Sequence, residues 1–412
     1  MHVSGSASLG NGANTLNMRL AFWAMTSLFF IWGFITALND ILLPYLQGAF
    51  ALSYLQAALV QFCFFGAYFV VSPLAGMLIE RIGFQRGMVV GLLTTAMGAV
   101  LFYPAAALAW YAFFLLALFV LASGITVLQV SANPYVAVLG DPRHAASRLN
   151  LAQAMNSLGH TAGPWFGAVL ILSAGTVAGD ATSVQGPYLL LAAVLIVAAL
   201  FFYWLRLPLL QQNAPLAKAN FATLMHRFPQ LRFGVLAIFL YVGAEVAVGS
   251  YLVGLFMQLQ IPGMDKVTAG KMVSYYWGAA MLGRFVGALL MRVMPAAKLL
   301  LIHAVLAVTA IVLAVNSQGE SAMWLMLSVG LFNSIMFPTI FTLAINGLAQ
   351  YTGRASGYLC QAIVGGAVVP LLQAGVADIW SLHGSFLVPA CAYVYIGWYA
   401  WRGYKTRIDT GV

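Results

Sequence analysis

Long apolar runs constrain this chain more than any other feature of its sequence. A helix needs about 20 predominantly apolar residues to cross a membrane, and the chain offers roughly twelve such stretches. They fall near residues 20–48, 54–80, 87–107, 111–139, 148–175, 186–206, 231–259, 267–291, 297–316, 321–348, 354–378 and 384–402. Charged residues make up only 7% of the chain, whereas soluble domains carry about 25%. The runs are too long and uniform for the alternating strands of a membrane β-barrel. The sequence therefore predicts an all-α membrane protein with twelve transmembrane helices.

The basic residues predict how these helices are oriented. Of the 18 lysines and arginines, all but Lys266, Lys271 and Arg284 flank the even-to-odd connections or the two termini. Because cytoplasmic loops are enriched in basic residues, both termini and the long 207–230 connection are predicted to be cytoplasmic. The net charge of +9 therefore indicates topology, and it does not indicate nucleic-acid binding.

The long connection divides the chain into two predicted bundles. Residues 1–19 are predicted to be a disordered cytoplasmic tail, because they are small and polar and lack the pattern of a cleaved signal peptide. They precede an N-terminal six-helix bundle (20–206), a cytoplasmic linker (207–230), a C-terminal six-helix bundle (231–402) and a second tail (403–412).

The two halves of the sequence also share short motifs at matching positions. Gly76-x-Leu78-x-x-Arg81 recurs as Gly287-x-Leu289-x-x-Arg292, and Asn133-Pro134 has a counterpart in Phe337-Pro338. Matching positions favour a parallel duplication, with a solute site between the halves.

Two acids lie inside long apolar segments, Asp40 and Glu245. An ionisable group in hydrocarbon costs roughly 2.5 kcal/mol or more, so such a group usually marks a solute or proton path. The alternative is a buried acid satisfied by its neighbours. Arg284 is a third intramembrane charge, and the sequence does not name its partner.

One loop carries a more specific signal. Residues 76–86 (GMLIERIGFQR) resemble the loop motif of the major facilitator superfamily, with Glu80 in place of the usual Asp. The resemblance implies that Glu80, Arg81 and Arg86 form a gating charge cluster at the cytoplasmic helix ends. For Arg86 alone, a purely topogenic role is the alternative.

Further motifs narrow the resemblance. The segments 39–44 (NDILLP), 132–140 (ANPYVAVLG), 148–156 (RLNLAQAMN) and 337–341 (FPTIF) resemble motifs of the L-fucose:proton symporter family within that superfamily. The resemblance implies a twelve-helix secondary transporter that imports a monosaccharide with a proton by alternating access. It also implies that Asp40 is the coupling proton site.

One departure from the L-fucose pattern bears on the substrate. Gln129 stands where the L-fucose permease has a glutamate, and Glu245 stands where it has an amide. The Glu245 pattern looks like the glucose/galactose transporter branch, which favours a hexose such as glucose or galactose. L-fucose or an amino sugar as substrate, and sodium in place of the proton, remain alternatives.

A sugar site needs amides and carboxylates, because each hydroxyl both donates and accepts hydrogen bonds. Gln129 and Asn133 are four residues apart and Gln153 and Asn156 three apart, so each pair shares a helix face. The predicted sugar-binding residues are Gln129, Asn133, Gln153, Asn156, Glu245, Asn333 and Gln361. Glu245 is also a candidate for a proton-coupling role. For each amide, a hydrogen bond between helices is the alternative.

Other function classes fit the sequence less well. The loops are short and hold no paired carboxylates or other catalytic arrangement, so we expect no enzyme, cofactor or metal site. A receptor would need a larger soluble domain. The expected partners are a monosaccharide, a proton and the lipid bilayer, with no nucleic acid. We expect a monomer in a plasma membrane, the inner membrane of a bacterium.

Overall fold

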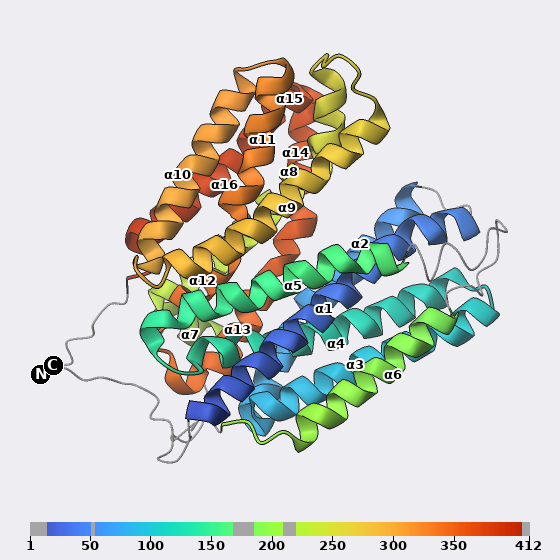
Figure 1. The fold of residues 1–412 in the computed structure, drawn as a ribbon, viewed down its shortest axis with the longest axis vertical. Helices are drawn as coiled ribbons and strands as arrows, with labels where there is room; N and C mark the ends of the chain where they lie inside the picture. Colours follow the sequence, from blue (N-terminus) through green and yellow to red (C-terminus); the bar gives the residue numbers. More distant parts are fainter. Residues whose placement is uncertain (1–14, 51–53, 168–184, 209–219, 406–412) are drawn as a thin grey trace, which may run out of the picture. The chain divides into compact units, whose positions relative to one another are not determined.

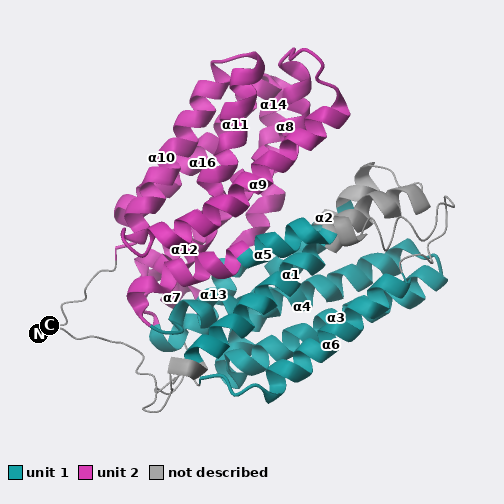
Figure 2. Cartoon of the chain, viewed as in Figure 1, with its two compact units in different colours: residues 1–140, 155–216, 349–361 teal, residues 141–154, 217–348, 362–412 magenta. Residues whose placement is uncertain are grey.

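The computed structural model describes residues 15–50, 54–167, 185–208 and 220–405, although the side chains of residues 15–17, 38–50, 54–58, 61 and 164–167 are outside the described part. The described chain forms two compact units, and its regular structure is helical (Figure 1). Unit 1 comprises residues 1–140, 155–216 and 349–361, and unit 2 comprises residues 141–154, 217–348 and 362–412 (Figure 2).

The helices of unit 1 come mostly from the first half of the chain. They are α1 (Thr15–Phe50), α2 (Tyr54–Ile82), α3 (Phe84–Ala107), α4 (Tyr111–Val138), the larger part of α5 (Ala145–Gly167), α6 (Gln185–Trp204) and α13 (Thr352–Gln361).

Unit 2 contains the start of α5 and most of the second half of the chain. Its helices are α7 (Phe221–Arg227), α8 (Pro229–Gln258), α9 (Lys266–Leu290), α10 (Ala296–Val315), α11 (Gly319–Asn333), α12 (Met336–Ile345), α14 (Gly365–Ile379), α15 (Leu382–Ser385) and α16 (Leu387–Trp398).

The helices match the predicted apolar segments closely, and the differences have local causes. Nine spans in the described residues are long and apolar enough to cross a membrane. Of the other predicted spans, 148–175 is described only to residue 167 and 267–291 carries two basic residues, Lys271 and Arg284. The predicted helices 321–348, 354–378 and 384–402 are interrupted by short breaks or turns of other helix types. The break in 321–348 lies just before Pro338, where proline disturbs the hydrogen-bond pattern.

Small residues allow the helices to pack closely. A Cβ at Gly98 would overlap Leu121, and one at Gly124 would overlap Thr95, so α3 and α4 meet backbone to backbone. In unit 2, a Cβ at Gly365 would overlap the backbone of Phe239 on α8. Such contacts are typical of membrane helices, which associate by close packing rather than by the hydrophobic effect.

Two segments pack with the opposite half of the sequence. The segment 349–361 lies in unit 1, where α13 packs on α2 and α4, and the segment 141–154 lies in unit 2. The bundle boundaries 20–206 and 231–402 remain a prediction. The packing of these two segments nevertheless identifies α13 and the start of α5 as places where one half of the sequence contacts the other.

Candidate functional site

The intramembrane acid Glu245 lies in a buried polar cluster within unit 2. Its Oε1 is 3.7 Å from Nη2 of Arg284 on α9, and both side chains are largely buried. Tyr276, also on α9, donates a hydrogen bond from its hydroxyl to the main-chain oxygen of Glu245 at 3.2 Å. Asn333 at the end of α11 donates to that hydroxyl at 2.5 Å. The structure thus connects two predicted site residues, Glu245 and Asn333, through a tyrosine.

Arg284 also caps a broken helix. Its Nε donates to the carbonyl of Ser334 at 3.1 Å. In a regular helix that carbonyl would accept from residue 338, but Pro338 has no N–H to donate. The guanidinium therefore bridges a carboxylate on α8 and the carbonyl that Pro338 leaves unsatisfied. This answers the question of the partner of Arg284, which the sequence leaves open.

The acid of the predicted gating cluster pairs with an arginine far away in the sequence. Glu80, near the end of α2, accepts a hydrogen bond from Nη2 of Arg354 on α13 at 2.5 Å, and its side chain is 2% exposed. Arg81 and Arg86 are exposed. A Cβ at Gly76 would lie 3.2 Å from the Cα of Gly357, so α2 and α13 cross closely here.

Two further prolines each leave a helix carbonyl without its usual donor, and side chains of α13 donate to both carbonyls. Pro134 leaves the Val130 carbonyl of α4 without its helical donor, and Ser356 Oγ donates to it at 2.8 Å. Pro73 does the same to the Phe69 carbonyl of α2, which accepts from Nε2 of Gln361 at 3.1 Å. Together with the Glu80–Arg354 ion pair, these bonds attach α13 to α2 and α4.

The start of α5 makes comparable contacts in unit 2. Ser147 Oγ donates to the Ala288 carbonyl at 2.5 Å. Asn150 Nδ2 lies 3.4 Å from both Met291 Sδ and Thr339 Oγ1. Polar side chains from the first half of the sequence therefore contact three places in the second half: α9, Met291 directly after α9, and α12.

The remaining predicted site residues lie on α1, α4 and α5. Asp40 belongs to α1, but its side chain is outside the described residues. Gln129 and Asn133 are buried one turn apart on α4. Gln153 is buried on α5, and Asn156 Nδ2 donates to the Phe29 carbonyl of α1 at 3.1 Å. Gln129, Asn133 and Gln153 are therefore buried, whereas Asn156 is half-buried.

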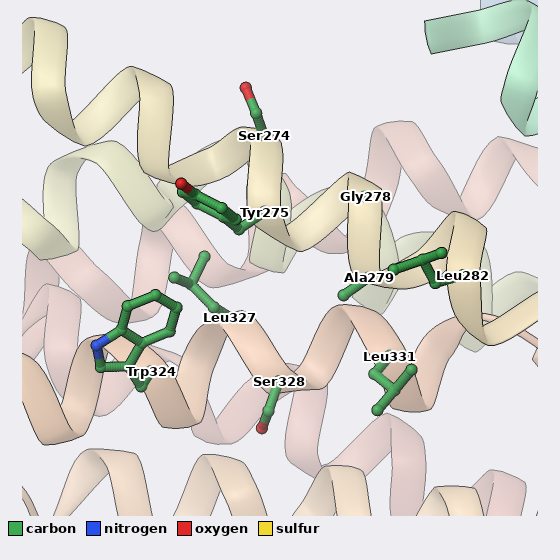
Figure 3. A pocket seen from close by; sticks show the side chains of 9 residues that line it. All are labelled: Ser274, Tyr275, Gly278, Ala279, Leu282, Trp324, Leu327, Ser328 and Leu331. Atoms are coloured by element: carbon green, nitrogen blue, oxygen red, sulfur yellow. The ribbon is translucent and has the colours of Figure 1, made fainter.

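A pocket of about 370 Å³ lies elsewhere, between α9 and α11 in unit 2. Figure 3 shows Tyr275 and Trp324 near one end of it, and their ring centroids are 6.1 Å apart. It is lined by Ser274, Tyr275, Gly278, Ala279, Leu282, Trp324, Leu327, Ser328 and Leu331, none of which is a predicted sugar ligand. The lining holds no amide or carboxylate, the groups on which the predicted sugar site depends.

The contacts of Arg354 and Ser356 are not among the sequence predictions, because these group Glu80 with basic residues of its own loop. The signal that could have found them is Gly353-x-x-x-Gly357, a pattern of small residues typical of close helix contacts in membranes.

The described residues contain no group of three His, Cys, Asp or Glu side chains that could hold a metal ion.

Comparisons with known proteins identify the family. Residues 22–359 match the Major Facilitator Superfamily. The chain belongs to the major facilitator superfamily. It is 50% identical to a glucose/galactose transporter of Brucella abortus over 393 residues, which cover 95% of each chain. It is 34% identical to the L-fucose-proton symporter of Escherichia coli over 404 residues, covering 92% of this chain and 91% of that one.

A solved structure shows the same fold for this major facilitator protein. A structure of the E. coli fucose:proton symporter matches with a TM-score of 0.88 and 32% identity, covering 95% of this chain and 100% of that one. The predicted all-α membrane fold and family are therefore confirmed. The chain is a multi-pass membrane transporter, not an enzyme, and its bacterial relatives place it in a bacterial inner membrane.

Proposed function

We propose that this protein imports a hexose such as glucose or galactose together with a proton. The observation that carries the proposal is the 50% identity to a glucose/galactose transporter along nearly the whole chain. Glu245 supports it, because a carboxylate in the membrane-spanning part can accept hydrogen bonds from sugar hydroxyls. A second candidate substrate is L-fucose, which the structural match to the fucose symporter favours.

Uptake by the purified protein tests this proposal. Vesicles containing only this protein are loaded at neutral pH and given labelled D-galactose, D-glucose, L-fucose or an amino sugar. We expect hexose accumulation that requires an inward proton gradient and persists without sodium. Accumulation of L-fucose alone would favour the second candidate, and a strict sodium requirement would contradict proton coupling. No uptake of any sugar would refute the function.

Asp40 is proposed as the residue that binds the coupling proton. It lies on α1, and its neighbours in the sequence are mostly apolar. A charged acid in hydrocarbon is costly, which favours binding of a proton. Pro44 follows one turn later, and its missing N–H weakens the helix beside Asp40. Substrate arrival can therefore change the solvation of this acid.

The sugar ligands are proposed to be Glu245 together with the predicted amides, Gln129, Asn133, Gln153, Asn156, Asn333 and Gln361. An amide that already donates one bond keeps further capacity, because it has a second N–H and a carbonyl oxygen. Gln361 can therefore hydrogen-bond Phe69 and still bind a hydroxyl. Asn333 likewise has a carbonyl oxygen beyond the N–H given to Tyr276.

Access is proposed to alternate by rocking of residues 20–206 against 231–402, with both termini cytoplasmic and the protein acting as a monomer. Glu80 and Arg354 form an ion pair near the C-terminal end of α2, the end predicted to be cytoplasmic, and Ser356 and Gln361 add two bonds to α4 and α2. We propose that these contacts hold α13 in one access state and break in the other. The exposed Arg81 and Arg86 would add to the local positive charge.

A further inference from the structure

The surroundings of Glu245 bear on the charge that this acid carries. Arg284 is held at one end by the Ser334 carbonyl at 3.1 Å, and at the other end it reaches Glu245 at 3.7 Å. Because the carbonyl is fixed by the backbone of a broken helix, the guanidinium has a defined position rather than a free surface rotamer. Glu245 is therefore accompanied by a positive charge built into the fold.

The groups facing Glu245 come from several helices. Tyr241 on α8, Tyr276 on α9 and Tyr393 on α16 lie close enough to interact with it electrostatically. Asn333 on α11 reaches it through Tyr276. Two more helices packed on α8 bring apolar groups to residues near Glu245. Val369 of α14 lies against Gly243, and the Phe337 ring of α12 lies 6.5 Å from that of Tyr241. Among these groups Arg284 carries the positive charge.

The energetics follow from these surroundings. A largely buried carboxylate is costly when isolated, but a nearby guanidinium favours its charged form. An arginine does not lose its proton in proteins, so its charge persists throughout the cycle. A carboxylate that stays charged is a strong hydrogen-bond acceptor for hydroxyls, but it is a poor carrier of a proton that must be bound and released.

We propose that Arg284 is a positioning residue that keeps Glu245 as a charged hydroxyl acceptor for the sugar, so that Asp40 alone carries the coupling proton. This inference rests on the proposed function and goes beyond it, because it separates the roles of the two acids. It also assigns a substrate-linked role to an arginine whose bond to Ser334 would otherwise suggest helix capping alone.

The test compares sugar affinity from acidic to alkaline pH for four proteins: wild type, Glu245→Gln, Arg284→Gln and the double variant. Equilibrium binding of labelled D-galactose is measured on the purified protein. We expect Glu245→Gln to lower the affinity about tenfold or more at every pH. In Arg284→Gln, Glu245 gains a proton as the pH falls, so the affinity falls with it, by up to about tenfold per pH unit.

The double variant separates this role from a structural one. It should bind as weakly as Glu245→Gln and lack the new pH dependence, because no carboxylate remains to titrate. Arg284→Lys, which keeps the positive charge, should retain the wild-type pH profile. Lys271→Gln, an exposed substitution on the same helix, is the matched control and should bind as wild type does.

Three results would overturn the proposal. They are a wild-type pH profile in Arg284→Gln, the same new pH dependence in the double variant, and loss of only the pH dependence in Glu245→Gln. If Arg284→Gln does not fold, a changed pH profile in the charge-retaining Arg284→Lys would count against the proposal, and an unchanged one would support it. Failure of the proposed function is distinguishable, because the wild-type vesicles would then accumulate no sugar.

Discussion

The ion pair between Glu80 and Arg354 gives the sharpest prediction about gating. Glu80→Gln keeps the size and the hydrogen-bonding ability of the side chain and removes its charge. The pair is short, at 2.5 Å, and the Glu80 side chain is 2% exposed. Arg354 is 18% exposed, so water can partly solvate the guanidinium that the substitution leaves behind. We therefore expect a loss of about 1–3 kcal/mol from the state in which α13 contacts α2.

That loss shifts the equilibrium between the state in which α13 contacts α2 and the state in which it does not. A change of about 1–3 kcal/mol shifts a two-state equilibrium roughly 5- to 150-fold. Cys360 is a native reporter of this shift, because it is fully buried on α13 and close to Tyr68 of α2. With Cys63 and Cys391 replaced by alanine, the rate of Cys360 alkylation by N-ethylmaleimide should rise by the same factor.

The controls isolate the ion pair. Glu320→Gln, an exposed acid in the first turn of α11, should leave the alkylation rate unchanged. Arg354→Gln should raise the alkylation rate at least as much as Glu80→Gln does, because it leaves the more deeply buried Glu80 carboxylate without its partner. The double variant should not exceed Arg354→Gln, since both substitutions remove the same interaction. Sugar affinity should change less than the transport rate. Equal alkylation of Cys360 in wild type and Glu80→Gln would refute the reasoning.

Three further predictions concern the proton site and the attachment of α13. Asp40→Asn should abolish accumulation of sugar against its gradient and leave counterflow exchange measurable; full accumulation would remove Asp40 from coupling. Ser356→Ala removes the donor to the Val130 carbonyl, at a cost of about 1 kcal/mol, and should speed Cys360 alkylation about fivefold. Ser328→Ala, whose hydroxyl bonds within its own helix, should not. Gly357→Ala places a Cβ 2.6 Å from the Ser72 carbonyl and should increase alkylation more than Ser356→Ala does; an unchanged rate would show that the close crossing of α2 and α13 is dispensable.

The sequence by itself determined the class of protein and most helix positions. Runs of about 20 apolar residues have few alternatives to a membrane helix, because hydrocarbon leaves no partner for an unpaired backbone group. Motifs of a few residues, such as those around Asp40 and Asn133, were enough to indicate the family. Because charge is scarce in the membrane-spanning segments, Asp40, Glu245 and Arg284 also stand out from the sequence alone.

Only the tertiary structure decided which groups meet. The sequence shows that Pro73, Pro134 and Pro338 each leave a carbonyl unsatisfied, but the donors Gln361, Ser356 and Arg284 come from elsewhere in the chain. Glu80 likewise pairs with a residue 274 positions away. Such partners depend on how helices cross and rotate, which small residues such as Gly76 and Gly357 permit but do not specify. Long apolar runs encode the membrane helices, whereas long-range polar contacts depend on the three-dimensional packing of those helices.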